Sequence, residues 1–184
     1  MTLSEKEICV DKRLLCEAFF ELAQDEDLES ISIQKVCMQA DVKRGEFYDT
    51  YGNLDSLIED CEDFLLAEMR QCYDVPETIG DSLRNVIAVI AHIRERKFYY
   101  KVLFKPGILE NFKYKLEEIY TDNVLKRIDF NDKNPQTYYT KIFIMYGTLQ
   151  VIVKWLENDC DIPDEEFADL ILEMQRRGLR YVED

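Results

Sequence analysis

Two cationic side chains and a phenol stand close together near the N-terminus: Lys43, Arg44 and Tyr48. Ammonium and guanidinium groups neutralise phosphates, and a guanidinium can also pair with base edges in the major groove of DNA. A tyrosine hydroxyl can reach a phosphate oxygen. These residue types therefore favour recognition of nucleic acid, with solvated surface charges and a partly buried core tyrosine as the alternative interpretation.

The elements around these residues fit that chemistry. Residues 31–57 have the pattern of two short helices joined by a tight turn, which places one helix in the major groove. Ser32 is a good N-cap for the first helix. Asp41 stands at the turn, and aspartate tolerates the left-handed conformation better than most residues. The second helix is expected over residues 43–50, and we expect Val36, Ala40, Val42 and Phe47 to form the small core between the two helices.

Charge opposes this interpretation. The first 60 residues carry 15 acidic and six basic side chains, a net charge of −9. DNA binding depends on cations that release counterions from phosphates, and two of the acids, Glu46 and Asp49, lie on the expected reading helix. A carboxylate can accept a hydrogen bond from cytosine. We therefore expect DNA binding with a steep preference for low salt.

Outside this stretch the chain has the composition of a helical protein. It has 184 residues, 47% of them hydrophobic, and only six glycines and four prolines. Asn53 is a good cap for the helix that follows it. A polar loop is expected over 129–135, and a short aromatic segment over 97–104 ends at Pro106-Gly107. No strand pattern or repeat is seen. The apolar spacing predicts helices over 8–23, 54–73, 76–96, 108–128, 136–157 and 164–181.

The bulk properties limit the class of protein further. The net charge is −15, and neither a signal segment nor a long apolar run is present, so we expect a cytoplasmic protein with no membrane partner. The six cysteines are scattered along the chain, which favours buried thiols over a redox sensor and makes a zinc site the least favoured interpretation. His92 is the only histidine and is expected in a core or boundary position rather than as a ligand contact. We expect no catalytic residues, no metal site and no cofactor, and hence no enzyme.

The first 60 residues resemble the TetR family of bacterial transcriptional regulators. The match includes the Ala-Val pair around the turn and a Gly-x-Phe-Tyr recognition helix. Glu46, Asp49 and Leu54 depart from the family's usual residues, as does Lys43. The matching residues are Ala18, Phe19, Leu22, Ala23, Ile31, Ser32, Ile33, Val36, Ala40, Val42, Gly45, Phe47, Tyr48, Tyr51 and Leu57.

The resemblance implies an all-α fold of about nine helices. It implies a three-helix helix-turn-helix DNA-binding domain over residues 1–52 and a ligand-binding and dimerisation bundle over 53–184. Tyr146-Gly147-Thr148-Leu149 with Trp155-Leu156 looks like a helix of that second domain. It further implies a homodimer on a near-palindromic DNA operator, controlled by a small-molecule effector.

Three sets of site residues follow. Gly45 costs about 1 kcal/mol of helix propensity, which is reasonable where the backbone must approach a phosphate. Part of the dense aromatic set at 98–155 is expected to line an apolar pocket, which could favour a cation. Wide apolar stripes near the C-terminus are expected to pair with a twin. The DNA-binding candidates are Ser32, Lys43, Arg44, Gly45, Glu46, Tyr48 and Tyr51; the ligand candidates are Phe98, Phe104, Phe112, Tyr138, Phe143 and Tyr146; and the dimer candidates are Leu149, Ile152, Leu156, Leu170 and Met174.

The chief alternative keeps the fold and drops the DNA. In it, the acidic N-terminal domain docks on a partner protein, and the chain is a co-regulator built on the same scaffold. The salt dependence of DNA binding discriminates between the two hypotheses.

Overall fold

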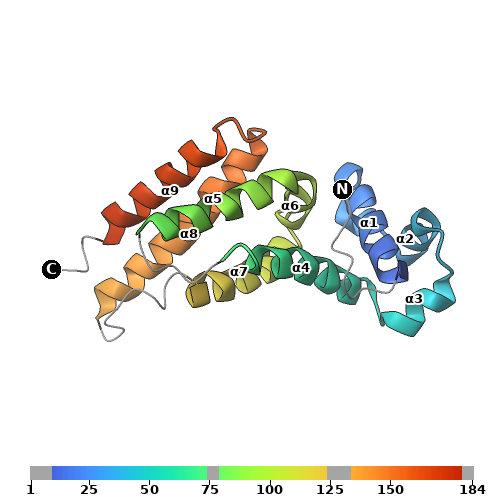
Figure 1. Cartoon of the computed structure of the whole chain (residues 1–184). Helices are drawn as coiled ribbons and strands as arrows, with labels where there is room; N and C mark the ends of the chain where they lie inside the picture. The colour runs from blue at the N-terminus through green and yellow to red at the C-terminus, as the bar shows by residue number, and fades with distance from the viewer. Residues whose placement is uncertain (1–9, 74–78, 124–133, 180–184) are drawn as a thin grey trace. The chain divides into compact units, whose positions relative to one another are not determined.

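The computed structural model describes residues 10–73, 79–123 and 134–179. Within these ranges the chain forms nine α-helices and one short 3₁₀ helix, with no strand, which confirms the all-α prediction. The elements are α1 (Val10–Asp25), η1 (Leu28–Ser30), α2 (Ile33–Ala40), α3 (Arg44–Thr50), α4 (Leu54–Arg70), α5 (Ile79–Glu95), α6 (Lys97–Leu103), α7 (Leu109–Asn123), α8 (Pro135–Glu157) and α9 (Asp164–Leu179) (Figure 1).

The helices pack as two compact units. Residues 1–68 and 98–112 form the first, which we call the head unit, and residues 69–97 and 113–184 form the second, the bundle unit. A segment from the middle of the chain therefore packs with the N-terminal helices. The predicted boundary between a DNA-binding domain, residues 1–52, and a ligand-binding domain, residues 53–184, is a division by function, and it stays a prediction.

The head unit is built on the apolar face of α1. Phe19 and Phe20 are fully buried, and α1 packs along α2. The Phe20 ring meets the Tyr99 ring of α6 edge-on, with 4.7 Å between centroids. Burial of each such side chain contributes on the order of 1.5–3 kcal/mol. Asn53 caps α4 as predicted, because its Oδ1 accepts the Ser56 N–H at 2.9 Å.

The bundle unit is held by α9, which packs against α5 and α8. The Trp155 ring of α8 stacks on Phe167 of α9 at 4.5 Å, with 12° between the planes. Trp155 Nε1 and the Arg94 guanidinium both donate to the Ile162 carbonyl, at 3.0 Å and 2.6 Å. Arg94 also pairs with the Asp164 carboxylate. These contacts attach the end of α5 to the turn between α8 and α9.

Where both ends of a predicted helix lie among the described residues, the boundaries agree to within about three residues, except in the middle of the chain. Residues 8–9, 124–128 and 180–181 of the predicted helices lie outside the described residues. Residues 97–103 form a helix, α6, where only an aromatic segment was expected. Tyr100 and Leu103 lie inward on it, and Gly107 at φ 96° then turns the chain. The predicted start at Pro76 and residues 129–133 of the predicted loop lie outside the described residues. Of the helices described, none is long and apolar enough to span a membrane.

Candidate nucleic-acid interface

The α2–α3 pair is fixed by the small core that the sequence predicted. Val36 and Phe47 are fully buried, and Ala40 and Val42 are each 8% exposed. Between the two helices Asp41 has φ 54° and ψ 38°, the left-handed conformation expected for it. That conformation costs most residues about 1–2 kcal/mol, and aspartate less. The turn therefore sets the direction of α3.

The outer edge of α3 is open. Its first residues are exposed, and Tyr48, one turn further on, is 50% exposed. A Cβ added at Gly45 would meet no atom within 4 Å. The glycine therefore serves no packing need inside the chain, and the backbone here is accessible to a partner. The exposed residues of this edge are Lys43, Arg44, Gly45, Glu46 and Tyr48.

Glu46 is turned back onto the start of its own helix. Its Oε2 accepts the Lys43 N–H at 2.9 Å, which satisfies one of the donors left free at a helix N-terminus. The carboxylate is thus committed to the helix start, although the whole side chain stays exposed. Asp49 remains as the exposed acid further along α3.

Arg44 and Tyr48 form a pair on the exposed edge. The guanidinium donates to the Tyr48 hydroxyl at 3.4 Å, and its carbon lies 5.9 Å from the centre of the ring. The two residues are one helical turn apart, so the contact runs along α3. It holds a five-donor cation on the exposed edge of α3.

Two other DNA-binding candidates, Ser32 and Tyr51, make structural contacts within the head unit. The exposed Ser32 caps α2, since its Oγ accepts the Lys35 N–H at 3.3 Å. Tyr51 is only 3% exposed, and its hydroxyl donates to Asp60 at 2.9 Å. Burial, first of all, raises the pKa of Tyr51. Its placement among the DNA contacts is therefore corrected: Tyr51 is a core residue, also contacted through its ring by Lys12.

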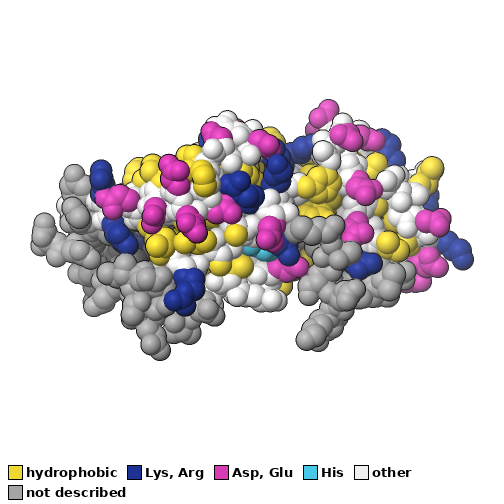
Figure 2. All heavy atoms as spheres, turned by 45° about the horizontal axis from the view of Figure 1, so that its top comes forward, with side chains coloured by type: hydrophobic (Ala, Val, Ile, Leu, Met, Phe, Trp, Pro, Cys, Tyr) yellow, Lys and Arg dark blue, Asp and Glu magenta, His cyan; other side chains and the backbone are white. Residues whose placement is uncertain are grey.

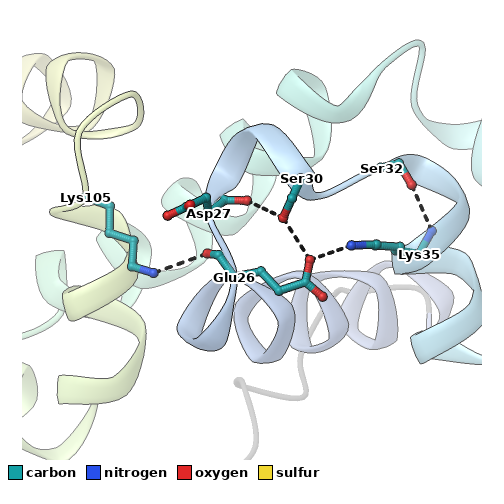
Figure 3. Close-up of polar contacts among 6 residues, drawn as sticks. All are labelled: Glu26, Asp27, Ser30, Ser32, Lys35 and Lys105. Atoms are coloured by element: carbon teal, nitrogen blue, oxygen red, sulfur yellow. Dashed lines mark hydrogen bonds and ion pairs between the residues drawn. The ribbon is translucent and has the colours of Figure 1, made fainter.

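The acidic run after α1 is partly neutralised locally. Glu26 accepts from Lys35 Nζ at 2.6 Å and from the Ser30 hydroxyl at 2.8 Å (Figure 3). The hydrogen bond from Lys35, followed by that from Ser30, lowers the pKa of Glu26. Elsewhere acidic side chains are scattered over the face drawn in Figure 2, among basic and hydrophobic ones.

Sequence reasoning missed one exposed residue of this region. Met38 on α2 is 74% exposed, a large value for an apolar side chain. The signal was available, because Val36, Cys37 and Ala40 define the inward stripe of α2 and Met38 falls outside it. A flexible apolar side chain here could pack on a thymine methyl or on a partner protein.

The six ligand candidates are divided between the two units and differ in burial. Phe112 is fully buried and packs on Phe104 at 5.7 Å between centroids, so it belongs to the core of the head unit. Tyr138 and Phe143 are 58% and 71% exposed. Tyr146 donates to Glu117 at 3.2 Å and lies under the Lys113 ammonium. Phe98, Phe104 and Phe112 fall in the head unit, and Tyr138, Phe143 and Tyr146 in the bundle unit.

One of these candidates, Phe143, helps to line an open hollow in the bundle unit. Its walls mix aromatic and hydroxyl-bearing side chains with backbone, and it is largely open to solvent. The residues that line it are Tyr139, Thr140, Phe143 and Gly178.

The dimer candidates divide by burial. Leu170 and Met174 on α9 are 38% and 49% exposed, whereas Leu149 and Ile152 on α8 are half-buried. Leu156 is 1% exposed, so its assignment to the interface is corrected. It lies next to Trp155 on the buried face of α8 and belongs to the core of its own chain.

The other chemically active residue types are mostly buried. His92 is 6% exposed on α5, in agreement with a core or boundary position. Burial raises the pKa of the Cys37 and Cys61 thiols, which makes them poor nucleophiles. Among the described residues, no group of three or more His, Cys, Asp or Glu side chains is placed to hold a metal ion. The free cysteines that the structure describes are Cys16, Cys37, Cys61, Cys72 and Cys160; Cys9 lies outside the described residues.

Three comparisons with known proteins bear on this geometry. Residues 81–177 match the family model for the transcriptional regulator C-terminal region of TetR type. The chain is 20% identical over 166 residues to an HTH-type transcriptional regulator, YxbF, of Bacillus subtilis (strain 168). That match covers 86% of this chain and 43% of the relative, so the chain spans less than half the length of this curated protein.

Solved structures share the fold. A TetR-like transcriptional regulator from Rhodococcus sp. RHA1 has a TM-score of 0.68 at 15% identity, over 96% of this chain and 99% of that one. The dihydroxyacetone kinase operon activator DhaS has a TM-score of 0.59 at 13% identity, over 94% of this chain and 96% of that one. At these identities the likeness concerns the fold.

Proposed function

The chain belongs to the TetR family of transcriptional regulators, and we propose that it binds a near-palindromic DNA operator as a homodimer. In this proposal residues 1–52 bind DNA, and residues 53–184 bind a small molecule and pair the two copies. The affinity for the operator then depends on whether the small molecule is bound.

One observation carries the DNA half of the proposal. The edge from Lys43 to Tyr48 is exposed, its one glycine has no packing role, and the acid beside them caps its own helix. Two cations and a phenol therefore lie open at the start of α3. In a helix-turn-helix those are the positions from which base edges and phosphates are reached.

Exposed apolar side chains support the homodimer. Leu170 and Met174 lie one turn apart on α9, and both are open to solvent in the single chain. A two-fold pairing would bury them and would present two copies of α3 to half-sites about one DNA turn apart, roughly 34 Å.

Control by a small molecule needs two states of the dimer. A bound molecule changes DNA affinity only by as much as it prefers one state over the other. The open hollow beside Phe143 is one place where such a molecule could bind.

A co-regulator that docks a partner protein is the second candidate. The net charge of −9 over the first 60 residues favours it, as does the exposed Met38. Both candidates use the same fold, and they differ in whether DNA is bound at all.

Selection from a random library of DNA duplexes tests the proposal. The purified full chain, at low salt, is expected to enrich sequences that contain two inverted half-sites. Replacement of Lys43 and Arg44 together by Gln should abolish the enrichment. Failure of the unmodified chain to enrich any sequence would contradict operator binding and would favour the co-regulator.

A further inference from the structure

A segment from the second half of the chain is built into the head unit. Residues 98–112 fall inside the region matched by the family's C-terminal model, yet they pack with residues 1–68. Besides the contact between Phe20 and Tyr99, a Cβ at Gly107 would lie 3.5 Å from Leu28 of η1. The turn between α6 and α7 therefore lies against the chain where it leaves α1.

Lys105, in this turn, caps α1 from a distant place in the sequence. Its ammonium donates to the Ala23 carbonyl, to that of Gln24 at 3.3 Å and to that of Glu26 at 3.5 Å. The last carbonyls of a helix have no partner within the helix, and a cation is favourable at that end. Lys105 supplies both the donors and the charge.

A second set of contacts continues from α1 to α2. The side chain of Glu26, whose carbonyl receives Lys105, accepts from Lys35 of α2 (Figure 3). The Lys35 N–H in turn donates to Ser32, the N-cap of α2. Lys105, Glu26 and Lys35 thus form a continuous polar path from the α6–α7 turn to the first turn of α2.

We propose that Lys105 is a positioning residue for DNA binding, which holds α1 and, through Glu26 and Lys35, fixes α2 and therefore α3. This inference rests on the proposed function, because it takes α3 as the element that binds DNA.

Variants of the full chain test the inference on one probe, the duplex that the unmodified chain enriches most strongly. Lys105→Met removes the ammonium and keeps the aliphatic stem, and it should weaken DNA binding by about tenfold or more. Lys105→Arg keeps a cation and should bind within about threefold of the unmodified chain. Lys154→Met removes the same charge from α8 and should leave DNA affinity unchanged.

A readout of local structure separates positioning from general stability. In Lys105→Met, hydrogen exchange should quicken in η1 and α2 while α8 and α9 keep their protection. Lys35→Met breaks the far end of the path and leaves the contacts of Lys105 with α1 in place. It therefore tests the inference even if Lys105→Met does not fold. It too should weaken DNA binding, and its effect should be less than additive with that of Lys105→Met.

The outcomes are distinguishable. If the unmodified chain enriches no duplex, the proposed function and this inference both fail. If it binds DNA but Lys105→Met binds equally well, or Lys154→Met loses as much affinity, the inference alone is overturned. Unchanged DNA binding by Lys35→Met would also overturn it.

Discussion

The contact between Arg44 and Tyr48 bears on the proposed role of Arg44 in reading a base. The guanidinium is held along α3 by the ring and hydroxyl of Tyr48, so in the proposed contact with a base it would lose fewer rotamers than a free side chain. Lys43 is the N-cap of α3, so it lies at the N-terminal end of the helix, where DNA phosphates are commonly bound. The two cations are therefore expected to make different contributions.

Substitution of each cation should separate base reading from phosphate binding. Arg44→Gln should cost about 1–3 kcal/mol on the preferred duplex and relax the preference at one base pair in each half-site. Lys43→Gln should weaken all sequences alike and reduce the salt slope by about one. Fluorescence anisotropy on matched and mismatched duplexes measures both. Equal and uniform losses for the two variants would refute the division of roles.

Gly45 allows stability and DNA affinity to be separated. Gly45→Ala should raise the free energy of unfolding by about 0.5–1 kcal/mol, since alanine favours helix and the added carbon meets nothing. The same carbon should weaken DNA binding if the backbone approaches a phosphate. Gly147→Ala in α8, also free of contacts, is the control: it should stabilise similarly and leave DNA binding unchanged. Urea unfolding and DNA titration of both variants decide the matter, and tighter DNA binding by Gly45→Ala would speak against close approach.

Among the elements, the connection between α1 and α2 should depend on pH. The pKa of Glu26 is lowered in the folded chain, so its contribution to stability is complete above the unfolded value near 4.5 and is lost as the pH falls through the lower, folded value. Glu26→Gln should therefore destabilise the protein at neutral pH and converge with the unmodified chain in acid. Urea unfolding across this range measures the difference, with Glu29→Gln as a control for charge. A difference in the free energy of unfolding between Glu26→Gln and the unmodified chain that persists in acid would contradict this explanation.

Local signals predicted the elements well. The cap at Ser32, the left-handed turn at Asp41 and the cap at Asn53 depend only on near neighbours in sequence, and all three are present. Helix α6 escaped prediction because its aromatic run has no clear one-sided stripe. Which of its residues are buried, Tyr100 among them, depends on the helices that pack against α6.

Contacts between distant residues were not predictable in this way. Tyr51 matched a residue of the family pattern, but the pattern did not show that its side chain is buried, with its hydroxyl bonded to Asp60 and its ring contacted by Lys12. Leu156 lies on an apolar stripe wide enough for a core and an interface, and the pattern could not say which of the two it serves. Lys105 bonds to a carbonyl 82 positions earlier, and no periodicity encodes that distance.

At the scale of the whole molecule, the exposed residues of α9 should determine the oligomeric state. Leu170→Glu combined with Met174→Glu places two charges on the face expected to pair and should convert a dimer to a monomer. Light scattering after size-exclusion chromatography reads the mass directly. Met38→Glu, at a still more exposed apolar position in the head unit, should leave the mass unchanged. A double variant that stays dimeric would place the interface elsewhere.

The net charge of −15 acts on every DNA encounter and makes salt the decisive variable. The most direct test is a mobility-shift titration of the full chain on its own upstream DNA as salt is raised from about 50 mM. We predict a retarded complex at micromolar protein that weakens steeply with salt and is absent for the variant with Lys43→Gln and Arg44→Gln. No retardation at the lowest salt, or a complex indifferent to those two residues, would contradict DNA recognition by α3.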